Sequence, residues 1–219
     1  MTKTSAPSFT RRLAPHEREQ QIVSKAVEHF STCGFAGSTR ELARQIGVTQ
    51  PLLYRYFPSK EALIERVYQE VYQWNPEWEK QIADRSVALD CRLATFYKSY
   101  AKTILRREWI RTFIFAGLDR EGINDRYLSR LKEKVFLPVL NEVRDHLGLS
   151  RPTTSIREEA EIELVWSLHA SIFYLGVRKW IYNLPITEDI DGYIERQIDV
   201  FHNGTQTVMK TLQDTESAG

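Results

Sequence analysis

The sequence predicts an all-α protein. Apolar residues recur every three to four positions through most of the chain, which is the spacing that places them on one face of a helix. At two places a Ser is followed three positions later by a Glu, which is a pattern typical of helix N-termini. No stretch alternates apolar and polar residues between turn signals for long enough to form a sheet. Helices packed on helices are therefore expected throughout.

The first two helices are predicted from the residues that begin and end them. Pro15 suits the first turn of a helix, and its apolar stripe stops before Gly34. Ser38 and Glu41 form a capping box in which the Ser hydroxyl accepts from the Glu amide while the Glu side chain reaches back. Gly47 then ends the second helix after only a few residues.

Two further helices follow from the same kind of signal. Thr49 can cap a third helix, with Pro51 in its first turn, where no backbone donor is needed. This helix is expected to run to about Phe57. Ser59 begins a fourth helix, which carries its apolar stripe toward Trp74.

The rest of the chain also predicts helices, in longer pieces. They cover residues 89–106, a shorter segment around 109–122, residues 127–147, residues 155–183, and a last helix after Thr187. Pro138 should kink the third of these. Ser155 and Glu158 form a second capping box, and Thr187 is expected to cap the last helix.

Composition excludes several classes of protein. With 219 residues, 42% hydrophobic and 27% charged, the chain is long enough for one large domain or two modest ones and is not of a disordered type. No apolar run approaches the ~18–20 residues of a membrane span, and the N-terminus lacks the apolar segment of a secretory signal. Cys33 and Cys91 are too few for a disulfide framework. A soluble cytoplasmic protein is expected.

Charge is unevenly distributed. Residues 1–60 hold nine Lys/Arg against four Asp/Glu, whereas the remainder holds 21 against 25. A basic head on a nearly neutral body suggests that the head binds a polyanion. An excess of this size can also arise by chance, so charge alone does not decide the matter.

The two short helices around Gly47 carry the most information. Ala43 is small where a second helix must approach closely, and Gly47 can adopt a left-handed turn without a steric penalty. This spacing is that of a helix-turn-helix, whose second helix enters the DNA major groove. The alternative is an ordinary corner between two helices of a core.

The wider stretch decides between these alternatives. Residues 34–63, GFAGSTRELARQIGVTQPLLYRYFPSKEAL, closely resemble the N-terminal DNA-binding domain of tetracycline-repressor-type (TetR-family) regulators. The resemblance covers about residues 18–70. Ser38, Pro51 and Tyr56 depart mildly from the family pattern, which more often has Thr, Gly or Ala, and His at these positions.

The resemblance implies a domain organisation. A flexible basic arm would cover residues 1–14, a helix-turn-helix domain residues 15–60, and a helical effector-binding and dimerisation domain residues 61–219. The helix at about residues 60–74 would link the last two. Beyond the first domain the chain matches the family only in the number and length of its helices.

Five side chains are predicted to contact DNA phosphates, which position a protein without reading sequence. Ser38 and Thr39 lie at a helix N-terminus, where free amides and the helix dipole favour a phosphate. Tyr54, Tyr56 and Lys60 supply two phenolic donors and an ammonium. The resemblance assigns phosphate contact to the same positions.

The bases are expected to be read by the third helix. Gln50 can pair with adenine, Arg55 with guanine, and Leu52 can touch only a thymine methyl group or exclude water. Thr49 and Pro51 lie close by on the same helix start.

For the other basic residues of the head, two interpretations stay open. Arg44 either contacts a phosphate or is a solvated helix residue. Arg11, Arg12 and Arg18 either reach the minor groove or backbone or belong to a flexible tail.

The C-terminal part suggests a dimer and a ligand pocket. Residues 162–182 are apolar all round the helix, which favours core on one side and a partner subunit on the other, although a central helix in a monomer is the alternative. The predicted dimer interface comprises Leu164, Leu168, Leu175, Ile194, Ile198, Phe201 and Val208. The predicted pocket, which the resemblance also implies, comprises Phe96, Tyr100, Trp109, Phe113, Trp166, His169 and Phe173. Each of these seven could instead be plain core.

Together these features predict a homodimeric, ligand-responsive transcriptional regulator that binds pseudo-palindromic double-stranded DNA, a repressor that an apolar or aromatic effector releases. A helical protein-interaction adaptor and a cofactor-free enzyme are the alternatives. The five histidines are scattered, and no metal-ligand spacing, Glu-x-x-His pair, phosphate loop or dinucleotide motif occurs. No catalytic residue, metal, cofactor or membrane partner is therefore expected.

Overall fold

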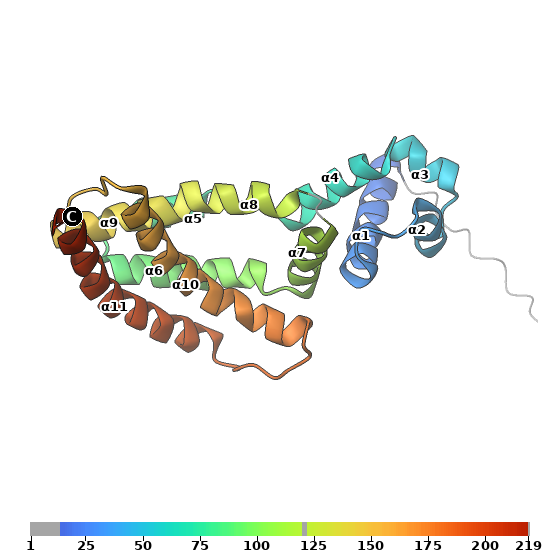
Figure 1. Cartoon of the computed structure of the whole chain (residues 1–219). Coiled ribbons are helices and arrows are strands. Elements are labelled where there is room, and N and C mark those ends of the chain that lie inside the picture. Colours follow the sequence, from blue (N-terminus) through green and yellow to red (C-terminus); the bar gives the residue numbers. More distant parts are fainter. Residues whose placement is uncertain (1–13, 120–121, 219) are drawn as a thin grey trace, which may run out of the picture.

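The computed structural model describes residues 14–119 and 122–218, which form helices and connecting turns with no strand. An elongated molecule results, with α1, α2 and α3 at one end and a longer helical body at the other (Figure 1). The predicted all-α fold is confirmed. None of the helices described is both long and apolar enough to cross a membrane. Arg11 and Arg12 of the predicted basic arm lie outside the described residues.

The N-terminal unit is built from three helices and a fourth that leads away from them. These are α1 (Pro15–Cys33), α2 (Thr39–Ile46), α3 (Gln50–Tyr56) and α4 (Lys60–Val71). Their apolar faces bury side chains that include Ile22, Phe30, Leu42, Leu53 and Leu63, and this core continues into the body. Helix α4 leads from this unit into the body (Figure 1).

The predicted N-caps of these short helices are confirmed. The hydroxyls of Ser38, Thr49 and Ser59 accept from backbone amides three residues on, at 3.2, 3.3 and 3.1 Å. Such caps satisfy amides that have no partner within the helix. The Glu41 carboxylate, expected to reach back to Ser38, instead pairs with the Arg44 guanidinium at 2.6 Å.

Within the described residues, the body consists of seven helices and one π-helical turn. They are α5 (Glu77–Ala83), α6 (Leu89–Ile104), α7 (Arg107–Asp119), α8 (Ile123–Leu131), η1 (Lys132–Phe136), α9 (Leu137–Leu147), α10 (Ser155–Trp180) and α11 (Ile190–Ala218). Helix α5 was not predicted, and α4 ends three residues before the expected Trp74. The paired helices α10 and α11 lie along one side of the body (Figure 1).

The stretch predicted as one kinked helix over 127–147 is α8, η1 and α9. Pro138 has no amide hydrogen to bond the carbonyl four residues earlier. The chain adapts in the preceding turn, where the Leu137 amide donates to the Lys132 carbonyl five residues back. The kink of the prediction is thus a π-turn just before the proline.

Two predicted caps in the body are wrong. The N-cap of α10 is Thr154 rather than Ser155, and its hydroxyl accepts from the Arg157 amide at 3.4 Å. The last helix begins at Ile190, and it is Asp189, not Thr187, that accepts from an amide of its first turn, that of Gly192, at 2.8 Å. In both places the helix is capped by a nearby residue whose side-chain oxygen can also accept a hydrogen bond from a backbone amide.

A buried charge network joins the ends of three body helices. Glu161 on α10 is fully buried and accepts from Arg157 at 2.8 Å and from Arg144 of α9. Arg157 also pairs at 2.8 Å with Glu216 near the end of α11. Each buried charge thus has an opposite partner, as burial in a low dielectric requires.

Candidate nucleic-acid interface and ligand site

The turn between α2 and α3 fixes the angle of the two helices. Gly47 has φ +76°, in the left-handed region, which residues with a side chain rarely adopt. The Val48 amide bonds back to the Ala43 carbonyl at 2.9 Å, which closes the end of α2. Ala43 and Leu53 are both buried where the helices meet. This is the geometry of a helix-turn-helix, with α3 presented at the surface.

The predicted DNA-contacting residues all have at least part of their surface open to solvent. The exposed ones are Ser38, Arg44, Thr49, Pro51, Tyr54 and Arg55, and the half-buried ones are Thr39, Gln50, Leu52, Tyr56 and Lys60. Leu53 and Phe57 between them are buried, as expected for the inward face of α3. One face of α3 is therefore free for contacts outside the chain.

Three of these residues form a hydrogen-bonded unit that the sequence did not predict. The hydroxyls of Thr39 and Tyr54 lie 2.9 Å apart, and the Gln50 side-chain amide donates to the Thr39 oxygen at 3.3 Å. Thr39 is the first residue of α2, whereas Gln50 and Tyr54 lie one turn apart on α3. The unit therefore fixes the start of α2, an anion-favouring helix N-terminus, to the exposed face of α3.

The charged residues of this face differ in their surroundings. The Arg55 guanidinium lies 5.7 Å from the centre of the Tyr56 ring, which orients it on α3. Arg44 is paired with Glu41, and this pairing lowers the pKa of the Glu41 carboxyl. A carboxylate beside Arg44 weakens its attraction for a phosphate, whereas Arg55 and Lys60 are in no salt bridge within the described residues.

Aromatic side chains fill the centre of the body. The predicted pocket residues lie on α6, α7 and α10, and all are buried except Trp166 and Phe173, which are half-buried. The Trp109 and Phe113 rings stack at 4.7 Å, and both contact Phe173. The structure thus brings these side chains together.

Several members of this cluster were not predicted from the sequence. Tyr127 of α8 contacts Trp109 at 5.2 Å, and Phe136 of η1 contacts His169 at 5.5 Å. Tyr72, the residue after α4, packs against Trp109 at 5.2 Å and shares a 2.7 Å hydrogen bond with the Thr112 hydroxyl. Only their contacts in space reveal them, because they come from segments far apart in the sequence.

Burial changes the titration of the polar members. It lowers the pKa of His169 to about 4, so the imidazole is neutral near pH 7. It raises the pKa values of Tyr97, Tyr100 and Tyr127 well above the ordinary value, so these phenols stay protonated. The centre of the body therefore carries hydrogen-bonding groups but no net charge.

Helix α7 connects this cluster with the N-terminal unit. On one side it carries Trp109 and Phe113. On another, the Arg111 guanidinium donates to the Ser31 and Thr32 carbonyls at the end of α1 and, at 3.2 Å, to the Trp180 carbonyl at the end of α10. The contacts of α7 thus span from the aromatic cluster to the domain that carries α3.

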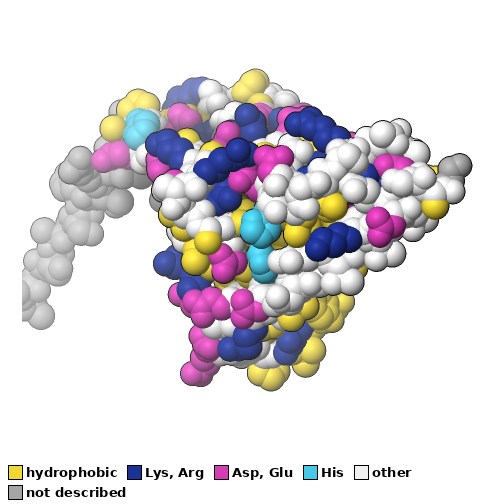
Figure 2. All heavy atoms as spheres, turned by 90° about the vertical axis from the view of Figure 1, so that its left-hand side faces the viewer, with side chains coloured by type: hydrophobic (Ala, Val, Ile, Leu, Met, Phe, Trp, Pro, Cys, Tyr) yellow, Lys and Arg dark blue, Asp and Glu magenta, His cyan; other side chains and the backbone are white. Residues whose placement is uncertain are grey.

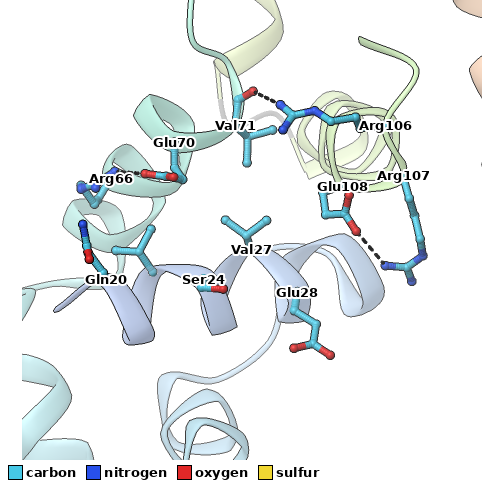
Figure 3. A pocket seen from close by; sticks show the side chains of 11 residues that line it. Gln20, Ser24, Val27, Glu28, Arg66, Glu70, Val71, Arg106, Arg107 and Glu108 are labelled. Carbon is cyan, nitrogen blue, oxygen red and sulfur yellow. Dashed lines mark hydrogen bonds and ion pairs between the residues drawn. The ribbon is translucent and has the colours of Figure 1, made fainter. Parts of the chain in front are cut away.

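A second link and a groove lie beside these contacts. The Phe35 amide, in the segment before α2, donates to the Asp119 carboxylate at 3.0 Å. A groove of about 650 Å³ separates α1 and α4 from the turn between α6 and α7, and Figure 3 shows Val27 and Val71 facing each other across it. Arg106 reaches from this turn to the Val71 carbonyl at the end of α4.

The predicted dimer residues divide into two groups. Leu168, Leu175, Ile194, Ile198 and Phe201 are buried within the single chain, whereas Leu164 is half-buried and Val208 is 41% exposed. An apolar groove of about 240 Å³ between α10 and α11 is lined by residues that include Leu164, Val200 and Val208. Hydrophobic side chains also gather along the lower edge of Figure 2, the side of the molecule where α10, α11 and their connection lie.

No metal site is formed by the described parts of the chain, in which no three His, Cys, Asp or Glu side chains come close enough to hold an ion.

Comparisons with solved structures identify the fold. A TetR-like transcriptional regulator from Rhodococcus sp. RHA1 is 18% identical, with a TM-score of 0.64 over 88% of this chain and 100% of that one. A putative transcriptional regulator from Pseudomonas aeruginosa PAO1 is 18% identical, with a TM-score of 0.64 over 91% and 98%. The fatty acid degradation regulator FadR from Bacillus halodurans is 13% identical, with a TM-score of 0.60 over 89% and 98%.

A search of curated proteins gives no match. The family model of bacterial regulatory proteins of the tetR family, in contrast, matches residues 22–67, which run from α1 through the helix-turn-helix into α4. Residues 22–67 are therefore similar to the tetR family of bacterial regulatory proteins, and the chain as a whole has the fold of TetR-like transcriptional regulators.

Proposed function

We propose that this regulator binds a pseudo-palindromic DNA site as a homodimer, and that a small molecule in the body releases it. The observation that carries the DNA-binding part is the exposed face of α3, fixed to the N-terminus of α2 through Thr39, Tyr54 and Gln50. As a repressor of this kind it would act in the cytoplasm.

The proposed contacts follow from side-chain chemistry. Ser38, Thr39, Tyr54, Tyr56 and Lys60 bind phosphates, because they offer hydroxyls or an ammonium at two helix starts and along α3. None of these five residues is proposed to contact a base. Their phosphate contacts set the depth and angle at which α3 enters the major groove.

Base reading belongs to Gln50, Leu52 and Arg55, with Thr49 and Pro51 lining the start of α3. Arg55 has a planar fork that fits guanine, and its orientation over Tyr56 limits its freedom before binding. Arg44 has a weaker role, because Glu41 already neutralises it.

The proposed dimer forms through the exposed parts of α10 and α11. Leu164, Val200 and Val208 line a shared apolar groove, and a second copy that buries it would place two α3 helices on one side of the DNA. The buried Ile194 and Ile198 support this face from within. Two such helices about 34 Å apart fit successive major grooves.

Release would pass through α7 and α4. A ligand that displaces Trp109 or Tyr127 would act on Tyr72, the residue after α4, and on α7, which Arg111 ties to α1. The groove between α1, α4 and the α6–α7 turn leaves room for such a shift (Figure 3). A change in the distance between the two α3 helices then prevents both from binding at once.

The test is selection of genomic duplex fragments by the purified protein at two salt concentrations. Wild-type protein is expected to enrich one inverted repeat that survives moderate salt, and Arg55→Ala to change the preferred base at one position of each half-site. Arg151→Ala, a substitution at an exposed arginine in the body, serves as the matched control and leaves the selected sequence unchanged. Sequence-blind binding that vanishes with salt would refute the proposal.

A further inference from the structure

The side-chain amide of Gln50 is held at one end and free at the other. Its nitrogen donates to the Thr39 hydroxyl oxygen at 3.3 Å, which connects the first residue of α3 to the first residue of α2. The amide oxygen of Gln50 makes no hydrogen bond within the described residues. Because α3 is the helix proposed to enter the major groove, this oxygen is the end of the amide that is available to a base.

The direction of this hydrogen bond follows from a count of hydroxyl protons. The hydroxyl oxygens of Thr39 and Tyr54 lie 2.9 Å apart, and the bond between them uses one of their two protons. A phosphate bound by this pair can only accept, so it takes the second proton. No proton is then left for Gln50, whichever of the two hydroxyls donates to the other. In the DNA complex the Gln50 amide must therefore donate to Thr39.

The start of α2 favours a phosphate beside this pair. The Glu41 amide is bonded to the Ser38 hydroxyl at 3.2 Å, whereas the backbone amides of Thr39 and Arg40 have no hydrogen-bond partner within the described residues. Unbonded amides at the start of a helix attract a phosphate. The Thr39 hydroxyl thus lies between the expected position of a phosphate and the side chain of Gln50.

We propose that Thr39 is a positioning residue that fixes the orientation of the Gln50 amide, so that the protein selects adenine over guanine at one base pair of each half-site. With its nitrogen held at Thr39, Gln50 accepts from adenine N6 through its oxygen and donates to adenine N7 through its second N–H. Guanine presents the acceptor O6 in place of the amino group, so two oxygens would face each other. The inference rests on the proposed function, since it states how one base is chosen at the same site.

The test compares binding to duplexes that carry adenine or guanine at one position of the selected half-site. Gln50→Ala identifies this position as the base pair at which the variant loses its preference. There the wild-type protein is expected to bind the adenine duplex about tenfold or more tightly than the guanine duplex. Thr39→Val has nearly the same shape but no hydroxyl, so the amide is free to turn its nitrogen toward guanine. The ratio of the two affinities in this variant is expected to fall to about one.

Two further variants and a second base pair separate orientation from a general effect on binding. Thr39→Ser keeps the hydroxyl and is expected to keep the preference for adenine. Tyr54→Phe removes a phosphate contact but still leaves Thr39 with no proton for Gln50, so affinity falls while the ratio of adenine to guanine binding stays the same. At the base pair where Arg55→Ala changes the preferred base, Thr39→Val should leave the preference unchanged, whereas a merely structural role of Thr39 would alter both base pairs.

Four results would overturn the inference. They are no base pair at which Gln50→Ala loses preference, a wild-type preference for guanine at that pair, a preference for adenine that persists in Thr39→Val, and a loss in Thr39→Val that extends to the pair read by Arg55. In each of these cases the wild-type protein still selects one inverted repeat, so the proposed function stands. Sequence-blind binding by the wild-type protein, in contrast, would refute the proposed function and this inference with it.

Discussion

The hydroxyl of Tyr54 shows how a single residue can serve both fold and function. It bonds Thr39 in the free protein, yet it lies at the exposed face of α3 beside the phosphate-favouring start of α2. The sequence pointed to both residues separately as phosphate contacts. Their mutual hydrogen bond could not be predicted, because it depends on how α2 and α3 cross.

Phosphate and base contacts should respond differently to substitution. Tyr54→Phe is expected to weaken binding to every sequence by a similar factor, because the lost contact carries no base information. Gln50→Ala is expected to lose about 1–3 kcal/mol of discrimination at one base pair. Its affinity for operators that carry a different base at that pair should stay nearly the same as that of the wild-type protein. Competition binding on a set of single-base operator variants measures both. A uniform loss for Gln50→Ala would place Gln50 on the backbone instead.

His169 makes stability depend on pH. Its pKa is lowered to about 4 in the folded protein against about 6.5 unfolded, so between these values the unfolded chain binds more protons and stability falls as the pH falls. From pH 7 to pH 5 the loss is about 2 kcal/mol. Urea unfolding of wild type and His169→Phe at both pH values should show the variant gaining by about this amount on acidification. A difference that is independent of pH would contradict the burial of a neutral imidazole.

At the scale of elements, the N-terminal unit was predictable and the body only partly so. Ser38, Thr49 and Ser59 each cap the helix they were expected to cap, because their hydroxyls are the first suitable acceptors before a short apolar stripe. In the body, Thr154 and Asp189 compete with equally good neighbours, and tertiary contacts decide. Thr154 also donates to Glu216, 62 residues away, which no local pattern reveals.

The aromatic centre shows the same limit. Residues on the stripes of α6, α7 and α10 could be identified from helical spacing, and they do come together. Tyr72 and Tyr127 were missed because they come from the end of α4 and from α8, and only the packing brings them to Trp109. Spacing identifies a face of a helix but not which faces meet.

The charge network of α9, α10 and α11 predicts a large effect of a single substitution. Glu161→Ala leaves Arg144 and Arg157 buried without their shared carboxylate, and unfolding free energy should fall by about 3–5 kcal/mol. Urea denaturation measures it. Glu163→Ala, at an exposed residue of the same helix, is the control and should change stability by less than about 0.5 kcal/mol. Similar small losses for both variants would show that the network contributes little.

The link through α7 can be tested at Arg111. Arg111→Met keeps the aliphatic stem but removes the donors to the carbonyls of α1 and α10, so stability should fall by about 1–3 kcal/mol. In the same variant, amide hydrogen exchange should increase at the end of α1 and remain unchanged in α9. Faster exchange spread evenly over the chain would indicate general destabilisation rather than a specific link.

For the whole molecule, the proposed function depends on a second copy of the chain. Val200 and Val208 are 68% and 41% exposed, so a charge at either position stays in solvent in the single chain but would be buried in the proposed dimer. Val208→Glu is expected to give a folded monomer by sedimentation. Val87→Glu, at a similarly exposed valine between α5 and α6, is expected to remain dimeric. A dimer in both variants would place the interface on another face.

The elongated shape connects these scales. The N-terminal unit lies at one end, and α10 and α11 run along the body (Figure 1). The aromatic cluster is formed by side chains of α6, α7, α8 and α10. Helices α4 and α7 connect the aromatic cluster with the N-terminal unit directly. In the proposed mechanism, a small change in the cluster would be passed on to α3, and in the proposed dimer it would change the spacing between the two α3 helices.

Hydroxyl-radical footprinting of the wild-type protein on its selected duplex can show whether the protein binds DNA as a dimer through α3. We expect two protected segments on one face of the DNA, with centres one helical turn or a multiple of it apart, and an equal loss of protection at both in Tyr54→Phe. A single protected segment, or protection that does not depend on sequence, would contradict a dimeric regulator that reads DNA through α3.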